Sequence, residues 1–259
     1  MNKLLVCSVF CGSELDSLWL NLQREFIRRT AGEFDHAVYL SHRADRELFK
    51  DCIIVDTYSP ADHPSWKHWR YGRGGDEHVT GLRALSAYCR RNPYSGYLIL
   101  DSDAFPVAPD WEELLRYCLK RFDKRCAAAV RIENLDAFAH PSVVYTQDPY
   151  ALHWGHKAGV NLLGESVTDV TCLETEFFPM IRTNRHSLHP TLASVYFSLF
   201  YHHGAGTRHL SRMRATSCGY YDHILMSPGY CDSEEILRRL QADPQAFING
   251  LTQETFQYA

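Results

Sequence analysis

The first 132 residues alternate short apolar runs with longer segments whose apolar residues recur every three or four positions. The short runs are rich in Val, Ile, Leu and Phe and lie between turn residues, which is typical of strands buried on both faces. The periodic segments predict amphipathic helices. Strands are predicted at Leu4–Phe10, Ala37–Leu40, Cys52–Val55, Tyr97–Leu100 and Ala127–Ile132. This alternation predicts an α/β fold with a doubly wound, mostly parallel central sheet flanked by helices.

Capping and turn residues suggest where the first two helices begin and end. Ser13 with Asp16 resembles a capping box ahead of the first helix, which Gly32 is expected to end. Asp76 is expected to cap the second helix, which runs to Arg91. The first strand and both helices thus have locally consistent boundaries.

The pattern changes after residue 132. Before that point, Asp110 with Glu113 forms another capping-box pattern at the start of a third helix. Beyond it, prolines, glycines and short apolar pieces make the chain less regular, until a final helix is predicted at Ser233–Leu240. The 259 residues suit a single domain with an elaborated second half.

Composition narrows the class of protein. The chain is 45% apolar and 22% charged, which is typical of a globular protein. Its net charge of -4 gives no general attraction to nucleic acid or acidic membranes, so neither is expected as a partner. No apolar run approaches the roughly 20 residues of a membrane span, so no integral membrane segment is expected.

The nine cysteines are scattered, and no two have C-x-x-C spacing. Most of them lie in apolar runs, which favours reduced thiols in a cytoplasmic protein over a disulfide framework. The first eleven residues superficially resemble a signal peptide. They lack a small-residue cleavage site and a charged amphipathic helix follows at once, so a first strand is preferred.

Two carboxylates, Asp101 and Asp103, follow the predicted strand Tyr97–Leu100 with Ser102 between them. In an open α/β sheet, ligands bind outside the carboxyl ends of the strands. Two like charges this close repel each other unless a cation lies between them. Mg²⁺ or Mn²⁺ takes one or two carboxylates and completes its shell with water and phosphate. The alternative is an Asx turn after a buried strand, which Asp and Ser also favour.

Three other segments offer candidate ligand contacts. Residues 57–75 mix aromatic and basic side chains without a regular period, which suits either a binding loop or a surface loop pinned by buried tryptophans. Asp56 closes a predicted strand and could meet a ribose or base, or simply form a turn. His202 and His203 precede a Gly-x-Gly turn and Arg208. An imidazole there could complete a metal shell, although histidines and glycine also end helices.

The combination resembles the GT-A class of nucleotide-sugar glycosyltransferases. The resemblance rests on four features of residues 3–132 and 196–208. They are the small-residue loop Cys11-Gly12-Ser13 after the first strand, the helix bearing Arg83 before an apolar strand, the D-x-D motif Asp101-Ser102-Asp103, and the H-x-x-G motif His203-Gly204-Ala205-Gly206.

The resemblance implies a metal-dependent enzyme that transfers a sugar from a UDP- or GDP-sugar donor to a glycan or small-molecule acceptor. Asp103 would bind the Mn²⁺ or Mg²⁺ that bridges the donor diphosphate, and Asp101 would bind the metal or the ribose. His203, or otherwise its neighbour His202, would complete the metal shell. Residues 1–132 would form the nucleotide-sugar-binding half, and residues 133–259 the acceptor-side half.

Further residues are implied at the donor. Phe10, Cys11 and Gly12 with Asp56 would face the nucleoside, Ser102 would lie beside the diphosphate, and Arg83 would reach the diphosphate or donor sugar. A lysine that follows the histidine-glycine motif in some retaining members is absent. His209 stands at that spacing, and Arg208 is the candidate replacement at the diphosphate.

The chemistry fits these residue types. A metal stabilises the charge that develops on the leaving diphosphate, so no protein acid is required. An inverting enzyme also needs a carboxylate as base for the acceptor hydroxyl. The candidates are Glu174, Glu176 and Asp169, and surface carboxylates are the alternative for each. A retaining enzyme needs no such base, and the residues do not distinguish the two.

Two other functions compete with this one. Phosphatases of the haloacid dehalogenase type also place D-x-D after an apolar strand. Their motif lies near the amino terminus and continues to Thr or Val two residues after the second Asp, where this chain has Phe105. The second competitor is a non-catalytic module that binds a nucleotide or glycan through the loop 57–75.

Overall fold

The computed structural model describes residues 3–59, 73–106, 109–121, 123, 125–128, 131–132, 138–139, 143–157, 160–163, 170–172, 200–202 and 233–247. Within these ranges, a mixed, mostly parallel sheet forms the centre of an α/β fold, as the sequence predicts. The organisation of residues 1–259 as one domain with two halves stays a prediction.

Seven strands form the main sheet in the order β12-β6-β9-β4-β1-β2-β3. Every neighbouring pair is parallel except those that involve β9, which runs antiparallel to both β4 and β6. The strands are β1 (Leu4–Phe10), β2 (Phe34–Ser41), β3 (Ile53–Tyr58), β4 (Gly96–Asp101), β6 (Cys126–Ala128), β9 (Val143–Thr146) and β12 (Val170–Cys172).

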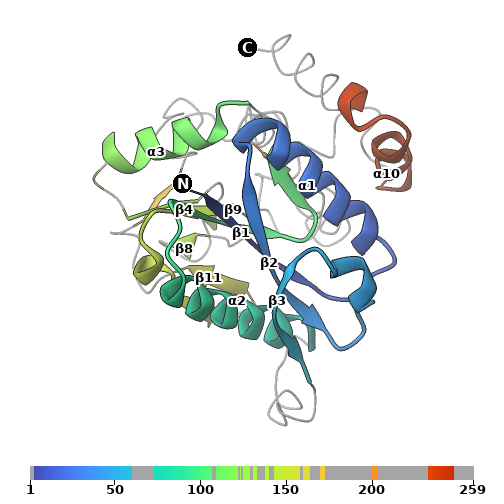
Figure 1. Cartoon of the computed structure of the whole chain (residues 1–259), viewed down its shortest axis with the longest axis horizontal. Coiled ribbons are helices and arrows are strands. Elements are labelled where there is room, and N and C mark those ends of the chain that lie inside the picture. The colour runs from blue at the N-terminus through green and yellow to red at the C-terminus, as the bar shows by residue number, and fades with distance from the viewer. Residues whose placement is uncertain are drawn as a thin grey trace.

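Helices cover both faces of this sheet, as Figure 1 shows. Helices α1 (Asp16–Ala31) and α3 (Trp111–Arg121) lie on one face, and α2 (Arg73–Arg91) lies on the other. All seven residues of β1 are buried, because alternate side chains meet helices on opposite faces. Leu5 packs in one cluster with Leu82 and Leu85 of α2, whereas Val6 packs with Ile27 of α1.

Smaller elements complete the fold. A four-stranded sheet has the order β10-β11-β8-β7, and a two-stranded sheet pairs β13 with β5. These strands are β5 (Ala104–Pro106), β7 (Arg131–Ile132), β8 (Phe138–Ala139), β10 (Trp154–Lys157), β11 (Val160–Leu163) and β13 (Phe200–His202). Two short 3₁₀ helices, η1 and η4, span Arg46–Phe49 and Pro149–Ala151.

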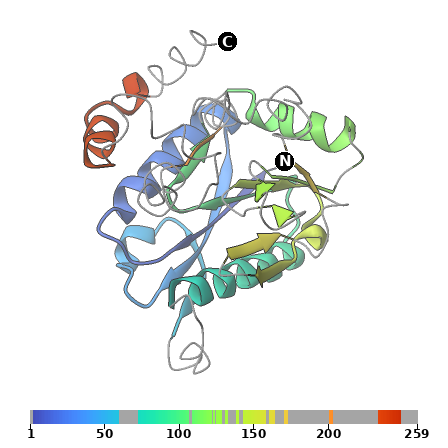
Figure 2. The same ribbon diagram turned by 180° about the vertical axis from the view of Figure 1, so that it is seen from behind.

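The final helix, α10 (Ser233–Ala242), lies beside α1 in both views of the ribbon (Figures 1 and 2). Leu240 and Phe247 join the apolar cluster that contains Phe26 of α1. Arg29 Nη1 donates to Gln245 Oε1 at 2.8 Å. Residues 233–247 therefore cover the outer side of the first helix.

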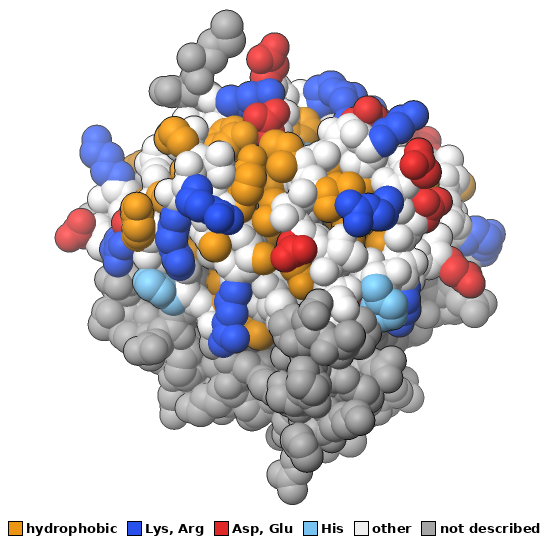
Figure 3. Space-filling model, turned by 60° about the horizontal axis from the view of Figure 1, so that its bottom comes forward, with side chains coloured by type: hydrophobic (Ala, Val, Ile, Leu, Met, Phe, Trp, Pro, Cys, Tyr) orange, Lys and Arg blue, Asp and Glu red, His pale blue; other side chains and the backbone are white. Residues whose placement is uncertain are grey.

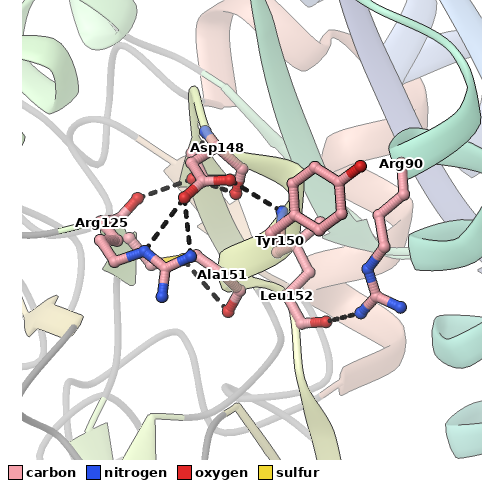
Figure 4. Close-up of polar contacts among 8 residues, drawn as sticks. Arg90, Arg125, Asp148, Tyr150, Ala151 and Leu152 are labelled. Atoms are coloured by element: carbon pink, nitrogen blue, oxygen red, sulfur yellow. Dashed lines mark hydrogen bonds and ion pairs between the residues drawn. The ribbon is translucent and has the colours of Figure 1, made fainter.

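Polar contacts hold the link between β9 and β10. Asp148 caps η4 by accepting from the Tyr150 amide at 2.9 Å, and its Oδ2 accepts from Arg125 at 2.7 and 3.0 Å. Arg90 of α2 donates to the Leu152 carbonyl at 2.6 Å. Figure 4 shows the two arginines reaching this link from opposite sides. The link is thus fixed both to the strand β6 region and to α2.

Several predicted boundaries are wrong. The first helix begins at Asp16, behind Leu15, which makes no side-chain cap, so Ser13 is not its N-cap. Asp16 is buried and instead accepts from the Gly12 amide at 3.1 Å and the Ser13 hydroxyl at 2.9 Å. The second helix begins at Arg73, so Asp76 lies inside it. Both contacts of Asp16 are local, and they hold the turn ahead of the helix rather than cap it.

The strand predicted at Ala127–Ile132 is also wrong. It divides into β6, which joins the main sheet, and β7, which joins the four-stranded sheet. A strand that was not predicted, β5, follows the turn after β4 and ends at Pro106. Strand β13 supplies the hydrogen-bonding partner for β5 from nearly 100 residues away.

No described helix combines the length and the apolar character that crossing a membrane requires. On the face drawn in Figure 3, Lys and Arg side chains lie among Asp and Glu side chains. Cys7, Cys11, Cys52, Cys89 and Cys126 are free thiols.

Candidate functional site

The order of the strands reverses between β1 and β4. From β1 the chain passes through α1 to β2 on one side, and α2 later returns it from β3 to β4 on the other side of β1. Ligands of open α/β sheets bind at such a switch point, outside the carboxyl ends of the strands. Val9 of β1 pairs with Asp101 of β4, so the loops that follow these two strands begin side by side.

The loop after β1 packs tightly against the loop after β2. Gly12 has φ +73°, and a Cβ atom there would lie 2.7 Å from Arg43 Cβ. Arg43 Nη2 donates to the Cys11 carbonyl at 2.9 Å, and Arg43 Nε donates to Ser41 Oγ at 3.3 Å. Only glycine fits this turn without displacing its neighbour.

Three acidic side chains influence the thiol of Cys11 electrostatically. Burial, followed by the carboxylates of Glu77, Asp16 and Asp101, raises the pKa of Cys11 to about 12 against the opposing effect of Arg43. The charges of three acids and one arginine therefore affect the same thiol, at the carboxyl edge of the sheet. The excess of negative charge favours a cation there.

Two neighbouring residues in the first turns of α2 face this edge. Glu77 is only 1% exposed; its Oε2 lies 3.5 Å from Arg43 Nη2, and its Oε1 has no hydrogen-bond partner within the described part of the chain. His78 Nε2 lies 3.1 Å from Asp101 Oδ1. Neither residue is among those predicted from the sequence. The sequence did contain one indication of their role: both stand at the start of a helix that follows a parallel strand, and such positions lie at the carboxyl edge of the sheet.

The turn from β4 to β5 carries the D-x-D motif. Asp101, Ser102 and Asp103 are all partly buried. Gln23 of α1, which the sequence pattern likewise does not single out, donates to backbone carbonyls of this turn. The motif is thus part of an ordered turn at the switch point.

His202 approaches the same turn along the backbone. Strand β13 pairs antiparallel with β5, and His202 lies opposite Ala104, the residue after Asp103. The alternative that these histidines end a helix is wrong for His202, because Phe200–His202 form a strand.

Three predicted donor contacts are engaged elsewhere. Phe10 is fully buried and packs against Phe49, with ring centroids 4.8 Å apart. Asp56 lies inside β3 rather than at its end, and its Oδ1 accepts from the next amide at 2.8 Å. Arg83 donates through Nε and Nη2 to the Trp154 carbonyl at 3.3 Å. The side chain of Phe10 is thus buried in the core, and its backbone, next to Cys11, is the part near the switch point.

The other predicted site residues lie outside the described residues. They are the candidate bases Asp169, Glu174 and Glu176, the metal candidate His203, the diphosphate candidate Arg208 and most of the loop 57–75. Their roles stay predictions.

The donor set at the switch point fits a hard divalent cation. Asp101 and Asp103 supply carboxylate oxygens, the ligands that Mg²⁺ and Mn²⁺ prefer, and such ions commonly take only one or two carboxylates. Among the described side chains, no group of three His, Cys, Asp or Glu could hold a metal alone. An ion bound here would therefore need ligands from water, substrate or other parts of the chain.

A pocket of about 470 Å³ lies near the opposite end of β2, away from the switch point. Its lining includes Lys3, Arg24, Asp35, His36 and Asp51. Ion pairs join Lys3 to Asp35 and Arg24 to Asp51 across this region. The pocket is therefore separate from the candidate site.

No protein-family model matches the sequence, and no curated protein matches it. Partial likenesses occur among solved structures. The galactosyltransferase LgtC, solved with donor and acceptor sugar analogues, is 14% identical with a TM-score of 0.36 over 56% of this chain and 61% of that chain. TarS 1–349 from S. aureus, solved with UDP-GlcNAc, is 10% identical with a TM-score of 0.36 over 98% and 92%. The mannosyltransferase PcManGT from Pyrobaculum calidifontis, solved with GDP-Man and Mn²⁺, is 11% identical with a TM-score of 0.33 over 97% and 86%.

The chain thus spans about three fifths of the galactosyltransferase chain that it matches. Two of the three proteins are named as glycosyltransferases, the class that the sequence resembles. At these identities and TM-scores, the likenesses assign neither a substrate nor an activity to this chain.

Proposed function

We propose that this protein is a metal-dependent glycosyltransferase that moves a sugar from a nucleoside-diphosphate donor to an acceptor hydroxyl. The observation that carries this function is the meeting of the Cys11–Gly12 loop and the Asp101–Asp103 turn at the switch point of the sheet. A diphosphate with a divalent cation suits the excess of acids found there.

Asp101 and Asp103 would hold the Mn²⁺ or Mg²⁺ ion. His202 or His203 would add an imidazole ligand. The pairing of His202 with Ala104 supports this, because the backbone of His202 lies beside the residue that follows Asp103. When bound, the ion would act as a Lewis acid that stabilises negative charge on the leaving diphosphate. The chain's carboxylates would in turn fix the ion at the carboxyl end of β4.

Other residues would bind the donor and the acceptor. The backbone at Cys11 and Gly12 would contact the nucleoside, and Arg208 would contact the diphosphate. Glu174, Glu176 or Asp169 would accept the proton of the acceptor hydroxyl if the reaction inverts the anomeric configuration. If it retains that configuration, no such base is needed.

Thermal unfolding with nucleotides and metals tests the donor site. MnCl₂ together with UDP or GDP should raise the melting temperature more than either one alone, since a ligand that binds the native state stabilises it. At 100 times Kd the gain is about 2.7 kcal/mol, or roughly 5–10 °C for a chain of this size. Asp103→Asn should abolish the joint effect, whereas Asp110→Asn, an exposed acid before α3, should preserve it.

Product analysis then separates enzyme from binding module. Incubation with UDP- and GDP-sugars and candidate acceptors should release the nucleoside diphosphate in wild type and not in Asp103→Asn. Joint stabilisation without any transfer or hydrolysis would favour the binding module. No stabilisation by any nucleoside diphosphate with Mn²⁺ would contradict the proposed function.

A further inference from the structure

One side chain connects α1 to the turn that carries the paired acids. Gln23 is fully buried, and its Nε2 lies 2.9 Å from the carbonyl oxygen of Asp101, 3.0 Å from that of Ser102 and 2.9 Å from that of Ala104. A primary amide has two N–H groups, so the three acceptors share two hydrogens. These carbonyls belong to the residues on both sides of Asp103.

The other end of this amide has a partner that fixes its orientation. Gln23 Oε1 accepts from the Ser8 hydroxyl at 3.1 Å. Rotating the amide by 180° would place its oxygen against three carbonyl oxygens, which cannot donate. The nitrogen must therefore face the turn.

Ser8 extends the network through the sheet. The single Ser8 hydrogen is directed to Gln23, so at 3.4 Å His36 Nε2 would be the donor to Ser8 Oγ. Hydrogen bonds then run in one direction from β2 through β1 and α1 to the turn. The three side chains of this hydrogen-bond network, His36, Ser8 and Gln23, are all buried.

We infer that Gln23 is a positioning residue for the D-x-D turn: its amide fixes the backbone from Asp101 to Ala104 and so sets the spacing of the two carboxylates. The role in metal binding rests on the proposed function, whereas the effect on the backbone does not. Removing the amide donors leaves three carbonyls without this shared partner. The turn then loses its anchor to the helix, although Asp101 and Asp103 remain in place in the sequence.

Gln23→Met tests this inference, because it removes the amide donors and keeps an unbranched side chain of similar length. Gln23→Glu is the second variant, in case the first does not fold, and its carboxylate cannot donate to the carbonyls when ionised. Ser8→Ala is the matched control. It removes the hydroxyl at the far end of the same amide and leaves the donors to the turn intact.

Hydrogen–deuterium exchange reports on the backbone without requiring activity. Exchange at the amides of residues 101–105 should speed up in the Gln23 variants and stay close to wild type in Ser8→Ala, with β1 and β2 unchanged in all of them. Exchange in this turn that is the same in wild type and in the folded Gln23 variants would overturn the inference.

Metal binding provides the second measurement. Isothermal titration of MnCl₂ in the presence of UDP should show an affinity about 10–100-fold weaker in Gln23→Met, the range typical of residues that support metal ligands. Ser8→Ala should bind within a few-fold of wild type. If wild type binds no Mn²⁺ with any nucleoside diphosphate, the proposed function fails, and the exchange measurement alone decides the role of Gln23. Wild-type Mn²⁺ affinity in a folded Gln23 variant would refute the role in metal binding.

Discussion

Gly12 and Arg43 approach each other so closely that a Cβ atom on Gly12 would lie 2.7 Å from Arg43 Cβ and 2.8 Å from the Arg43 carbonyl carbon. Real Cβ atoms do not reach such distances from backbone, so the two loops fit together only because residue 12 has no side chain. Gly12 also has φ +73°, a conformation that side chains other than glycine adopt at a cost. The geometry of the Cys11–Gly12 loop thus depends on the absence of a Cβ atom at residue 12.

Gly12→Ala should therefore be more destabilising than backbone strain alone explains. Gly32 provides the matched control, because it has φ +74° and no atom within 4 Å of an added Cβ. Gly32→Ala should cost about 1–3 kcal/mol for the strained conformation. Gly12→Ala should cost more, since the loop after β2 must also move. Urea unfolding of the two variants measures the difference.

The variants Gly12→Ala and Gly32→Ala also separate effects on stability from effects on ligand binding. Gly12 lies at the switch point, whereas Gly32 ends α1. Gly12→Ala should weaken the joint stabilisation by MnCl₂ and UDP, and Gly32→Ala should leave it unchanged. Equal unfolding energies for the two variants would show that the contact with Arg43 has no cost.

The sequence predicts the parts of this site that local patterns encode. Leu4–Phe10 and the strand ending at Asp101 are recognisable because continuous apolar runs mark strands buried on both faces. The order of strands and helices then indicates a doubly wound sheet, and Asp101 and Asp103 follow a buried strand of it. No contact between distant residues is needed for these predictions.

The neighbours of those acids could not be predicted in the same way. Gln23, Arg43 and His78 are 79, 59 and 24 residues from Ser102 in sequence, and each looks like an ordinary polar residue of a helix or turn. Their roles depend on tertiary contacts such as Gln23 Nε2 to the Ser102 carbonyl. The pairing of β13 with β5 is likewise set by contacts across nearly 100 residues.

The pair Arg43–Glu77 offers a test of the charges at the site. Glu77 is 1% exposed, and Arg43 Nη2 at 3.5 Å is the cation nearest to it among the ion pairs described. Arg43→Met should destabilise the fold by about 1–3 kcal/mol, because it leaves a buried carboxylate without a cation. Adding Glu77→Gln should restore part of this loss, which a double-mutant cycle of unfolding energies measures. Additive losses would mean that the two side chains do not interact.

Glu77→Gln should also change the thiol of Cys11. After burial, Glu77 is the largest cause of the raised pKa of Cys11. Neutralising it should lower this pKa from about 12, so that alkylation of Cys11 at alkaline pH becomes faster. Cys52 is an internal reference, because burial and Asp51 raise its pKa to about 11 against the opposing effect of Arg24, and Glu77 is not among the causes. A parallel change at both thiols would point to general loosening of the fold.

His78 should support the metal site through Asp101. His78 Nε2 lies 3.1 Å from Asp101 Oδ1, so it orients one oxygen of this carboxylate. If Asp101 binds the ion as proposed, His78→Ala should weaken Mn²⁺ binding in the presence of UDP by about 10-fold. The exposed His153, between η4 and β10, is the control, and His153→Ala should bind like wild type. Unchanged Mn²⁺ affinity in a folded His78→Ala protein would exclude this supporting role.

His36 should make the stability of the protein depend on pH. Burial, together with the charge of Arg24, lowers the pKa of His36 to about 3, whereas an unfolded histidine titrates near pH 6.5. Between these values the unfolded chain binds a proton that the native chain does not, so stability falls as the pH drops from about 6.5 towards 3, by up to about 1.4 kcal/mol per pH unit. Replacing His36 with Gln removes this proton, so wild type should exceed His36→Gln in stability by more at pH 7 than at pH 5. Urea unfolding across this range measures the difference, with His153→Gln at an exposed position as control. A stability difference between wild type and His36→Gln that is constant with pH would contradict the lowered pKa of His36.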